Sequence, residues 1–290
     1  MAVDVLFKKA LARVKDRYLN FLITTVLAWA IGLGIALLFG LGLGATFLTW
    51  ILAKNPTAVG VVGAVMSLLF LAALVYFTSW AQLATVDSLI QTKKLSPFEI
   101  YKKVQPMVKD YVVFAISLLL FFFGLLPFTL LSVFIVGLLW ALWSLFSIFV
   151  FLEKRKKGME NLWISREMVN QKFWPITGIV LLAILLSVIV SMIFMSSKNG
   201  FIGPLVSQLL ITPFVMSLYY EMYKTLKVPA SGKTPKIWMG LSIVGFIIII
   251  LTATILTQTL MKAIPNLLQD KTFQEEFYKE LQKSTLDDAS

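Results

Sequence analysis

Residues 111–152 read YVVFAISLLLFFFGLLPFTLLSVFIVGLLWALWSLFSIFVFL and contain no charged side chain. A helix of about 20 apolar residues crosses the roughly 30 Å of hydrocarbon in a bilayer, so this stretch is long enough for two crossings. Leu125-Leu126-Pro127 lies near its middle and predicts a tight turn, because proline lacks a backbone donor and disturbs the preceding helical turn. The stretch therefore predicts two transmembrane helices, at 111–126 and 128–152.

The composition of the 290-residue chain places it in the same class. Hydrophobic residues make up 59% of the chain and charged residues 14%, whereas soluble domains have about 45–50% and 25%. We therefore expect an all-α, polytopic helical membrane protein. Its transmembrane domain covers 1–262 and an amphipathic C-terminal tail covers 263–290. The expected spans are at about 20–44 (with an interfacial continuation over 45–53), 57–81 (with a more polar continuation through Asp87 to Gln91), 111–126, 128–152, 173–195, 204–223 and 237–260.

Three basic segments recur along the chain, each just before a long apolar run. They are LFKKALARVKDRYLNF from Leu6, SPFEIYKKVQPMVKDYVVF from Ser96 and GMENLWISREMVNQKFW from Gly158. Their mixture of Lys and Arg with apolar and aromatic residues is typical of helices that lie in the membrane interface. We interpret the chain as three repeats of an interfacial elbow helix plus a transmembrane hairpin, which give six spans. The seventh, C-terminal span is an addition to this pattern.

The distribution of Lys and Arg predicts the orientation. Residues 1–20 hold five, 91–110 hold five, 153–172 hold six and 224–236 hold four, whereas the loops between them hold only Lys54 and Lys198. Cytoplasmic loops carry the excess of positive charge. We therefore expect a bacterial cytoplasmic membrane protein with its N-terminus inside and, after seven spans, its C-terminus outside. The net charge of +11 follows from the same loops and indicates no nucleic-acid partner.

Three acidic residues fall near the cytoplasmic ends of the predicted hairpins: Asp87, Glu153 and Glu221. Acids at this depth are costly unless they are paired or hydrated. One interpretation is that they pair with nearby Lys or Arg, or lie in headgroup water. The other is that they converge and line a polar cytoplasmic vestibule.

The residues needed for most catalysis are missing. The chain has no cysteine and no histidine, which excludes thiol chemistry and removes the commonest general base and transition-metal ligand. No catalytic, cofactor-binding or metal site is predicted, and we expect no enzyme activity and no cofactor. Gly40 and Gly44 form a GxxxG spacing, which predicts close helix contact.

Basic side chains in the cytoplasmic loops are candidates for contacts with anionic lipid headgroups, which attract such clusters. The candidates are Lys102, Lys103, Arg155, Lys156 and Arg166. Membrane lipids are the expected partners, and a membrane-protein partner or a homo-oligomer is left open.

The third basic segment carries a family resemblance. In FLEKRKKGMENLWISREMVNQKFWPITGIVLL a span ends in an acid, a Gly-containing elbow follows, and Ser165-Arg166 precedes the aromatic pair Phe173-Trp174. This pattern, mainly within residues 150–185, resembles uncharacterised bacterial multi-span proteins related to the glycerophosphoryl diester phosphodiesterase membrane-domain family. The resemblance implies six spans with elbow helices. Some relatives carry a soluble phosphodiesterase domain, whose catalytic histidines have no counterpart in this chain.

Two functions are compatible with these observations. The first is a non-enzymatic integral membrane protein, lipid-associated or scaffolding. The alternative is a transporter of small solutes or lipids with a polar path near Asp87, Glu153 and Glu221. A water-accessible cavity that touches two of these acids would favour transport.

Overall fold

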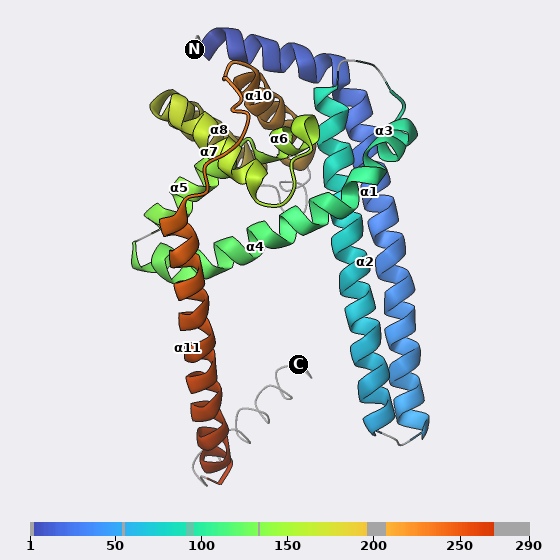
Figure 1. The fold of residues 1–290 in the computed structure, drawn as a ribbon. Helices are drawn as coiled ribbons and strands as arrows, with labels where there is room; N and C mark the ends of the chain where they lie inside the picture. The colour runs from blue at the N-terminus through green and yellow to red at the C-terminus, as the bar shows by residue number, and fades with distance from the viewer. Residues whose placement is uncertain are drawn as a thin grey trace. The chain divides into compact units, whose positions relative to one another are not determined.

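The computed structural model describes residues 3–53, 56–91, 93, 95–132, 134–195 and 207–269. All regular secondary structure within these residues is helical (Figure 1). The elements are α1 (Val3–Ala53), α2 (Pro56–Ile90), α3 (Pro97–Val104), η1 (Gln105–Met107), α4 (Val108–Leu131), α5 (Ile135–Ser144), α6 (Ser147–Lys154), α7 (Glu160–Gln171), α8 (Phe173–Met195), the π-helical turn η2 (Ser207–Ile211), α10 (Thr212–Lys224) and α11 (Lys236–Gln269).

Six helical segments of the described residues are long and apolar enough to cross a membrane. They are Val3–Gly42, Gly63–Ile90, Pro97–Leu131, Ile135–Lys154, Phe173–Met192 and Lys236–Met261. The predicted all-α, multi-pass membrane architecture is confirmed at this level. The predicted span at 204–223 is not among the six, and its first residues lie outside the described part of the chain. A seven-span topology therefore stays a prediction.

The described helices belong to two compact units. The first combines Met1–Leu119 with Leu138–Pro235, and the second combines Leu120–Gly137 with the chain from Lys236 onwards. Helices α4 and α5 each contribute to both units. A cluster of buried apolar side chains lies in the first unit, where Phe146 contacts the ring of Tyr223 and Phe149 contacts the rings of Tyr220 and Tyr223.

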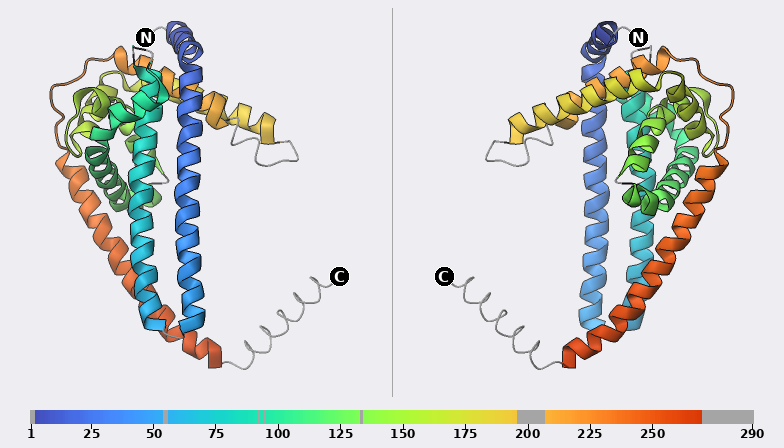
Figure 2. Two further views of the ribbon diagram at one scale, coloured as in Figure 1. Left: turned by 90° about the vertical axis from the view of Figure 1, so that its right-hand side faces the viewer. Right: turned by 90° about the vertical axis from the view of Figure 1, so that its left-hand side faces the viewer.

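Helices α1 and α2 lie side by side as a long antiparallel hairpin (Figures 1 and 2). The first turns of α1 run across the direction of the rest of the helix (Figure 1). The helix is unbroken through Ala53, so the interfacial continuation expected over 45–53 belongs to the same helix as the first span. On α2, the helix continues beyond residue 81 to Ile90, as the more polar continuation expected through Asp87 to Gln91 predicts.

The break predicted at Pro127 is wrong. Helix α4 continues through Pro127 to Leu131, and the chain reverses before α5 begins at Ile135. Membrane helices tolerate an internal proline because neighbouring groups satisfy the freed carbonyl. The stronger signal is Ser132, whose Oγ accepts a hydrogen bond from Val136 N at 3.1 Å and so caps the start of α5. Phe134 adopts a left-handed conformation at φ 69°, which completes the reversal.

Close contact through glycine occurs at a different place from the predicted one. A Cβ at Gly40 or Gly44 would meet no atom within 4 Å, so the GxxxG spacing does not mark a packed interface in the described structure. In the second unit, a Cβ at Gly245 would collide with the carbonyl oxygen of Gly124, and one at Gly124 would collide with Ser242. Helices α4 and α11 therefore approach each other at this glycine pair.

The short helices α3 and α7 each bury one face within the first unit. In α3 the buried residues are Ile100, Tyr101 and Val104, and Ser96 caps the helix in a reciprocal box with Glu99. In α7 the buried residues include Leu162, Ile164 and Met168. The first basic segment lies at the start of α1, the second runs from α3 through η1 into the start of α4, and the third runs through α7 into the start of α8.

The linker between α10 and α11 runs along α7. Gln171 donates to the carbonyl of Lys227 at 2.7 Å and accepts from its N–H at 3.2 Å. Glu167 accepts from the N–H of Lys233 at 2.6 Å, and Gly232 lies so close to Trp163 that a Cβ would collide with it. These contacts fix the linker to one face of α7. Beyond α11, residues 270–290 of the predicted amphipathic tail lie outside the described residues.

Candidate functional site

Asp87 forms an ion pair with a lysine of the second basic segment. It is 4% exposed and lies near the end of α2. Lys103 Nζ of α3 lies 2.8 Å from each of its carboxylate oxygens. This contact ties the end of α2 to the short helix that follows it.

Glu221 of α10 pairs with the N-terminal segment. Arg13 of α1 donates from Nε at 2.8 Å and from NH2 at 2.6 Å to the same oxygen, Oε1. Lys224 Nζ lies 3.4 Å from that oxygen. The side chains of Arg13 and Glu221 are 17% and 7% exposed, so this is a largely buried pair, whose strength depends on good geometry and further hydrogen bonds. Arg13 supplies those bonds, because its NH1 also donates to the carbonyls of Leu89 and Ile90 at 3.3 Å.

Glu153 has tyrosine partners instead of a cation in the described structure. At the end of α6 it accepts from Tyr223 Oη at 2.8 Å and from Tyr220 Oη at 3.3 Å. The Arg13 guanidinium lies 4.8 Å from the centre of the Tyr220 ring, within the range of cation–π attraction.

These contacts connect two of the three predicted acids. Glu153 and Glu221 meet through Tyr220 and Arg13, in a set of contacts that we call the Arg13 network: Arg13, Glu153, Tyr220, Glu221 and Tyr223. Asp87 pairs separately with Lys103. Among the residues that the structure describes, no group of three or more acidic side chains is arranged to hold a metal ion.

The first turns of α1 also bind the segment that follows α2. Arg17 NH1 donates to the carbonyl of Lys93 at 3.1 Å, and Asn20 Nδ2 donates to that of Leu95 at 3.0 Å. Arg17 is 7% exposed. The N-terminal basic segment thus uses its long polar side chains to satisfy carbonyls at the end of its own hairpin, where the helical ladder leaves acceptors free.

The five predicted headgroup contacts separate into two groups. Three have partners in the chain: Lys103 pairs with Asp87, Lys156 with Glu160 at 3.2 Å, and Arg166 lies over the Trp143 ring at 5.3 Å. Lys102 and Arg155 are exposed. Arg155 ends α6 in a left-handed conformation at φ 50°.

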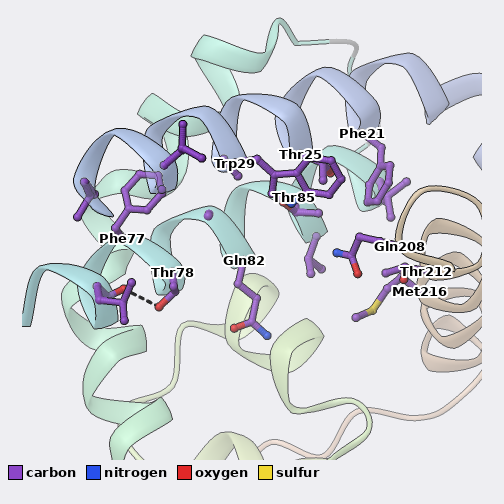
Figure 3. A pocket seen from close by; sticks show the side chains of 18 residues that line it. Phe21, Thr25, Trp29, Phe77, Thr78, Gln82, Thr85, Gln208, Thr212 and Met216 are labelled. Atoms are coloured by element: carbon purple, nitrogen blue, oxygen red, sulfur yellow. Dashed lines mark hydrogen bonds between the residues drawn. The ribbon is translucent and has the colours of Figure 1, made fainter. Parts of the chain in front are cut away.

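A groove of about 550 Å³ lies between α1, α2 and the η2–α10 segment (Figure 3). Figure 3 shows the amides of Gln82 and Gln208 ending in the same open space, one from α2 and one from η2. The lining residues are Phe21, Thr25, Ala28, Trp29, Gly32, Leu33, Ile35, Leu74, Phe77, Thr78, Ala81, Gln82, Thr85, Val86, Leu89, Gln208, Thr212 and Met216. None of the three acids lines it.

One polar atom of the groove is left unsatisfied. Thr25 is 3% exposed, and its Oγ1 makes no hydrogen bond to any described residue. Its neighbour Thr24 is equally buried, but Thr24 Oγ1 donates to the carbonyl of Asn20 at 2.6 Å and does not line the groove. A buried hydroxyl without a partner is uncommon in folded proteins and needs an explanation.

Neither the residues of the Arg13 network as a group nor those that line the groove were predicted from the sequence. The sequence singled out Glu153 and Glu221, but it gave no signal that Arg13, more than 200 residues away, would be the partner of Glu221. A repeating polar spacing on α2 was readable, because Thr78, Gln82 and Thr85 are separated by four and three residues and so share one helical face. Comparison of the chain with models of known protein families, with curated proteins and with solved structures gives no match.

Proposed function

We propose that this chain is a non-enzymatic integral protein of a bacterial cytoplasmic membrane, lipid-associated or scaffolding in role. The observation that carries the proposal is that each of the three predicted acids has a partner within the chain: Asp87 with Lys103, Glu221 with Arg13, and Glu153 with Tyr220 and Tyr223. Carboxylates that hold helices together in this way are suited to fixing an assembly. Carboxylates that bind a moving solute need to exchange partners.

The apolar exterior supports the lipid-associated role. Large hydrophobic side chains are exposed along several helices, for example Leu37 and Leu41 on α1, Leu68 on α2 and Ile255 on α11. Exposed apolar surface of this extent marks contact with a membrane or a partner. The resemblance to the glycerophosphoryl diester phosphodiesterase membrane-domain family, the three elbow–hairpin repeats and the seventh span belong to the same proposal.

Transport through the acids is the rival function, and cysteine accessibility separates the two. The chain has no native cysteine, so any labelling reports an introduced one. Ser88 and Ser217 are fully buried, next to Asp87 and one turn before Glu221. We expect Ser88→Cys and Ser217→Cys to resist a small impermeant thiol reagent in inverted vesicles, while the exposed Thr225→Cys reacts. Reaction at both buried positions would reveal a water-filled path and favour a transporter.

The proposed orientation has its own test. Single cysteines at Lys54, Lys198 and Gln269 are expected to react with an impermeant reagent added outside the cell, and one at Lys156 is not. Labelling at Lys156 together with protection at Lys54 would reverse the orientation. If the cysteine at Gln269 is protected while the other three behave as expected, the chain crosses the membrane an even number of times and the proposed seventh span is wrong.

A further inference from the structure

The groove between α1, α2 and η2–α10 has the size and lining of a ligand site. Its volume of about 550 Å³ falls within the roughly 300–1,000 Å³ usual for small-molecule pockets. We propose that it binds an uncharged, single-chain amphipathic lipid of the monoacylglycerol class, with the acyl chain along the apolar wall and the hydroxyl or ester group at the Thr and Gln side chains. This inference rests on the lipid-associated role proposed above and assigns lipid binding to this groove.

The space arises from small residues on facing helices. Ala28 and Gly32 on α1 and Ala81 on α2 line the groove. A Cβ at Gly32 would lie 3.9 Å from the Phe77 ring, in ordinary van der Waals contact, so a longer side chain would extend into the groove. A site whose volume depends on two or three small side chains can be closed by a single substitution.

The lining is amphipathic, which suits a lipid chain with a polar group attached. Each helix contributes one face at helical spacing: Thr25, Ala28, Trp29 and Gly32 from α1; Thr78, Gln82 and Thr85 from α2; and Gln208, Thr212 and Met216 from η2 and α10. The remaining wall is aliphatic and aromatic, and includes Phe21, Phe77 and Leu89. Apolar walls with a few polar groups that fix orientation are the usual design of such pockets.

The polar part of the ligand is uncharged. Among the residues that the structure describes, no Asp, Glu, Lys or Arg lines the groove, and a charge without a partner in a low-dielectric environment is strongly unfavourable. Threonine hydroxyls and glutamine amides donate and accept hydrogen bonds, as the ester and hydroxyl groups of a neutral lipid require. The nearby Arg13 guanidinium is already bound to Glu221 and to two carbonyls.

The unsatisfied hydroxyl of Thr25 points to the bound state. Two other helical threonines, Thr24 and Thr78, donate to the carbonyl four residues earlier. Thr25 makes no such bond within the described part of the chain, although it is only 3% exposed. Leaving such a group buried and unpaired destabilises the folded protein. A ligand oxygen in the groove would accept its hydrogen bond and remove that cost.

Photolabelling in nanodiscs tests the proposal. The probe is a 1-monoacylglycerol with a diazirine in its acyl chain, applied to the full chain and mapped by peptide sequencing. We expect labelled peptides within 21–35, 74–89 and 208–216, and competition by excess monoolein but not by the same concentration of oleate. Labels spread over other lipid-facing helices, or better competition by oleate, would overturn the site or its uncharged chemistry.

The glycine pair on α1 gives a matched control. Gly32→Leu fills the groove, whereas Gly34 faces open space two residues later, so Gly34→Leu adds the same side chain outside it. We expect groove labelling at least tenfold lower in Gly32→Leu than in Gly34→Leu. If Gly32→Leu does not fold, Thr25→Val and Thr24→Val replace the pair, with labelling lowered several-fold only by Thr25→Val. Equal labelling within either folded pair would overturn the proposal.

The two proposals can fail separately. Groove labelling that is insensitive to these variants removes the lipid site, while resistance of Ser88→Cys and Ser217→Cys to thiol reagent would still support a structural role for the buried Asp87 and Glu221. Specific groove labelling together with reactive cysteines at both serines would keep the site and make the protein a transporter.

Discussion

The Arg13 network and the groove are built from overlapping helices but differ in how their polar atoms are satisfied. In the network, Glu221 accepts two bonds from Arg13, and Glu153 accepts one each from Tyr220 and Tyr223. In the groove, a buried threonine hydroxyl has no partner among the described residues, and two glutamines extend into open space (Figure 3). The first pattern is that of a structural contact and the second is that of a site awaiting a ligand. A search for charged residues alone would have selected the Arg13 network, and not the groove, as the ligand site.

The largest effect is expected from breaking the buried ion pair. Among the described residues, Arg13→Met leaves Glu221 with Lys224 as its one ion-pair partner, at 3.4 Å. The free energy of unfolding should therefore fall by about 3 kcal/mol, the lower end for a broken buried pair. Lys15→Met, at an exposed position of the same helix, is the control and should change little. The measurement is thermal unfolding of the purified proteins. Equal stability of the two variants would remove the structural role of the network.

A double substitution sharpens this result. Replacing both partners with apolar residues of similar size is often neutral, because no buried charge is left over. Arg13→Met combined with Glu221→Leu should therefore recover most of the stability lost in Arg13→Met. A double variant as unstable as the sum of the single ones would mean that the two residues do not act as a pair.

A smaller loss is expected at the tyrosines. Tyr223 donates to Glu153 at 2.8 Å, and Tyr223→Phe should cost about 1 kcal/mol, the usual worth of one hydrogen bond. Tyr219→Phe is the matched control on the same helix, because no hydrogen bond of the Tyr219 hydroxyl is found among the described residues and the change should be nearly neutral. Unfolding of the two variants in parallel checks this difference. A Tyr219→Phe loss as large as that of Tyr223→Phe would contradict it.

The smallest expected change in stability has opposite signs for the neighbouring residues Thr24 and Thr25. Without ligand, Thr25→Val should stabilise the protein by up to about 1 kcal/mol, because it removes an unpaired buried hydroxyl. Thr24→Val should destabilise it by about 1 kcal/mol, because the bond from Thr24 Oγ1 to Asn20 is lost. Destabilisation by both substitutions would show that the Thr25 hydroxyl is satisfied in the protein.

Local patterns predicted the class of fold and failed where a stronger local signal competed. Uncharged runs identified the apolar helices, since length and hydropathy are what a bilayer selects. The helix break was predicted at Pro127, but α4 ends just before Ser132, whose side chain can cap the next helix. Gly40 and Gly44 suggested packing by spacing, whereas Gly124 and Gly245, which have no spacing motif, make the close approach.

The candidate site was less predictable because its partners are distant in sequence. Acid positions were readable, since charges are rare beside apolar spans. The partner of Glu221 comes from the other end of the chain, and no periodicity encodes that choice. The groove combines three helix faces, of which only the α2 face has a polar spacing visible by itself.

The most direct test compares one variant from each region with and without a neutral lipid. Thermal unfolding of the wild type, Tyr223→Phe and Thr25→Val is measured in nanodiscs with and without saturating monoolein. We expect Tyr223→Phe to be less stable but to keep the full stabilisation by monoolein, and Thr25→Val to be as stable as the wild type or more so but to lose most of it. Equal stabilisation of Thr25→Val and the wild type, or its loss in Tyr223→Phe, would contradict the division between a structural network and a ligand-binding groove.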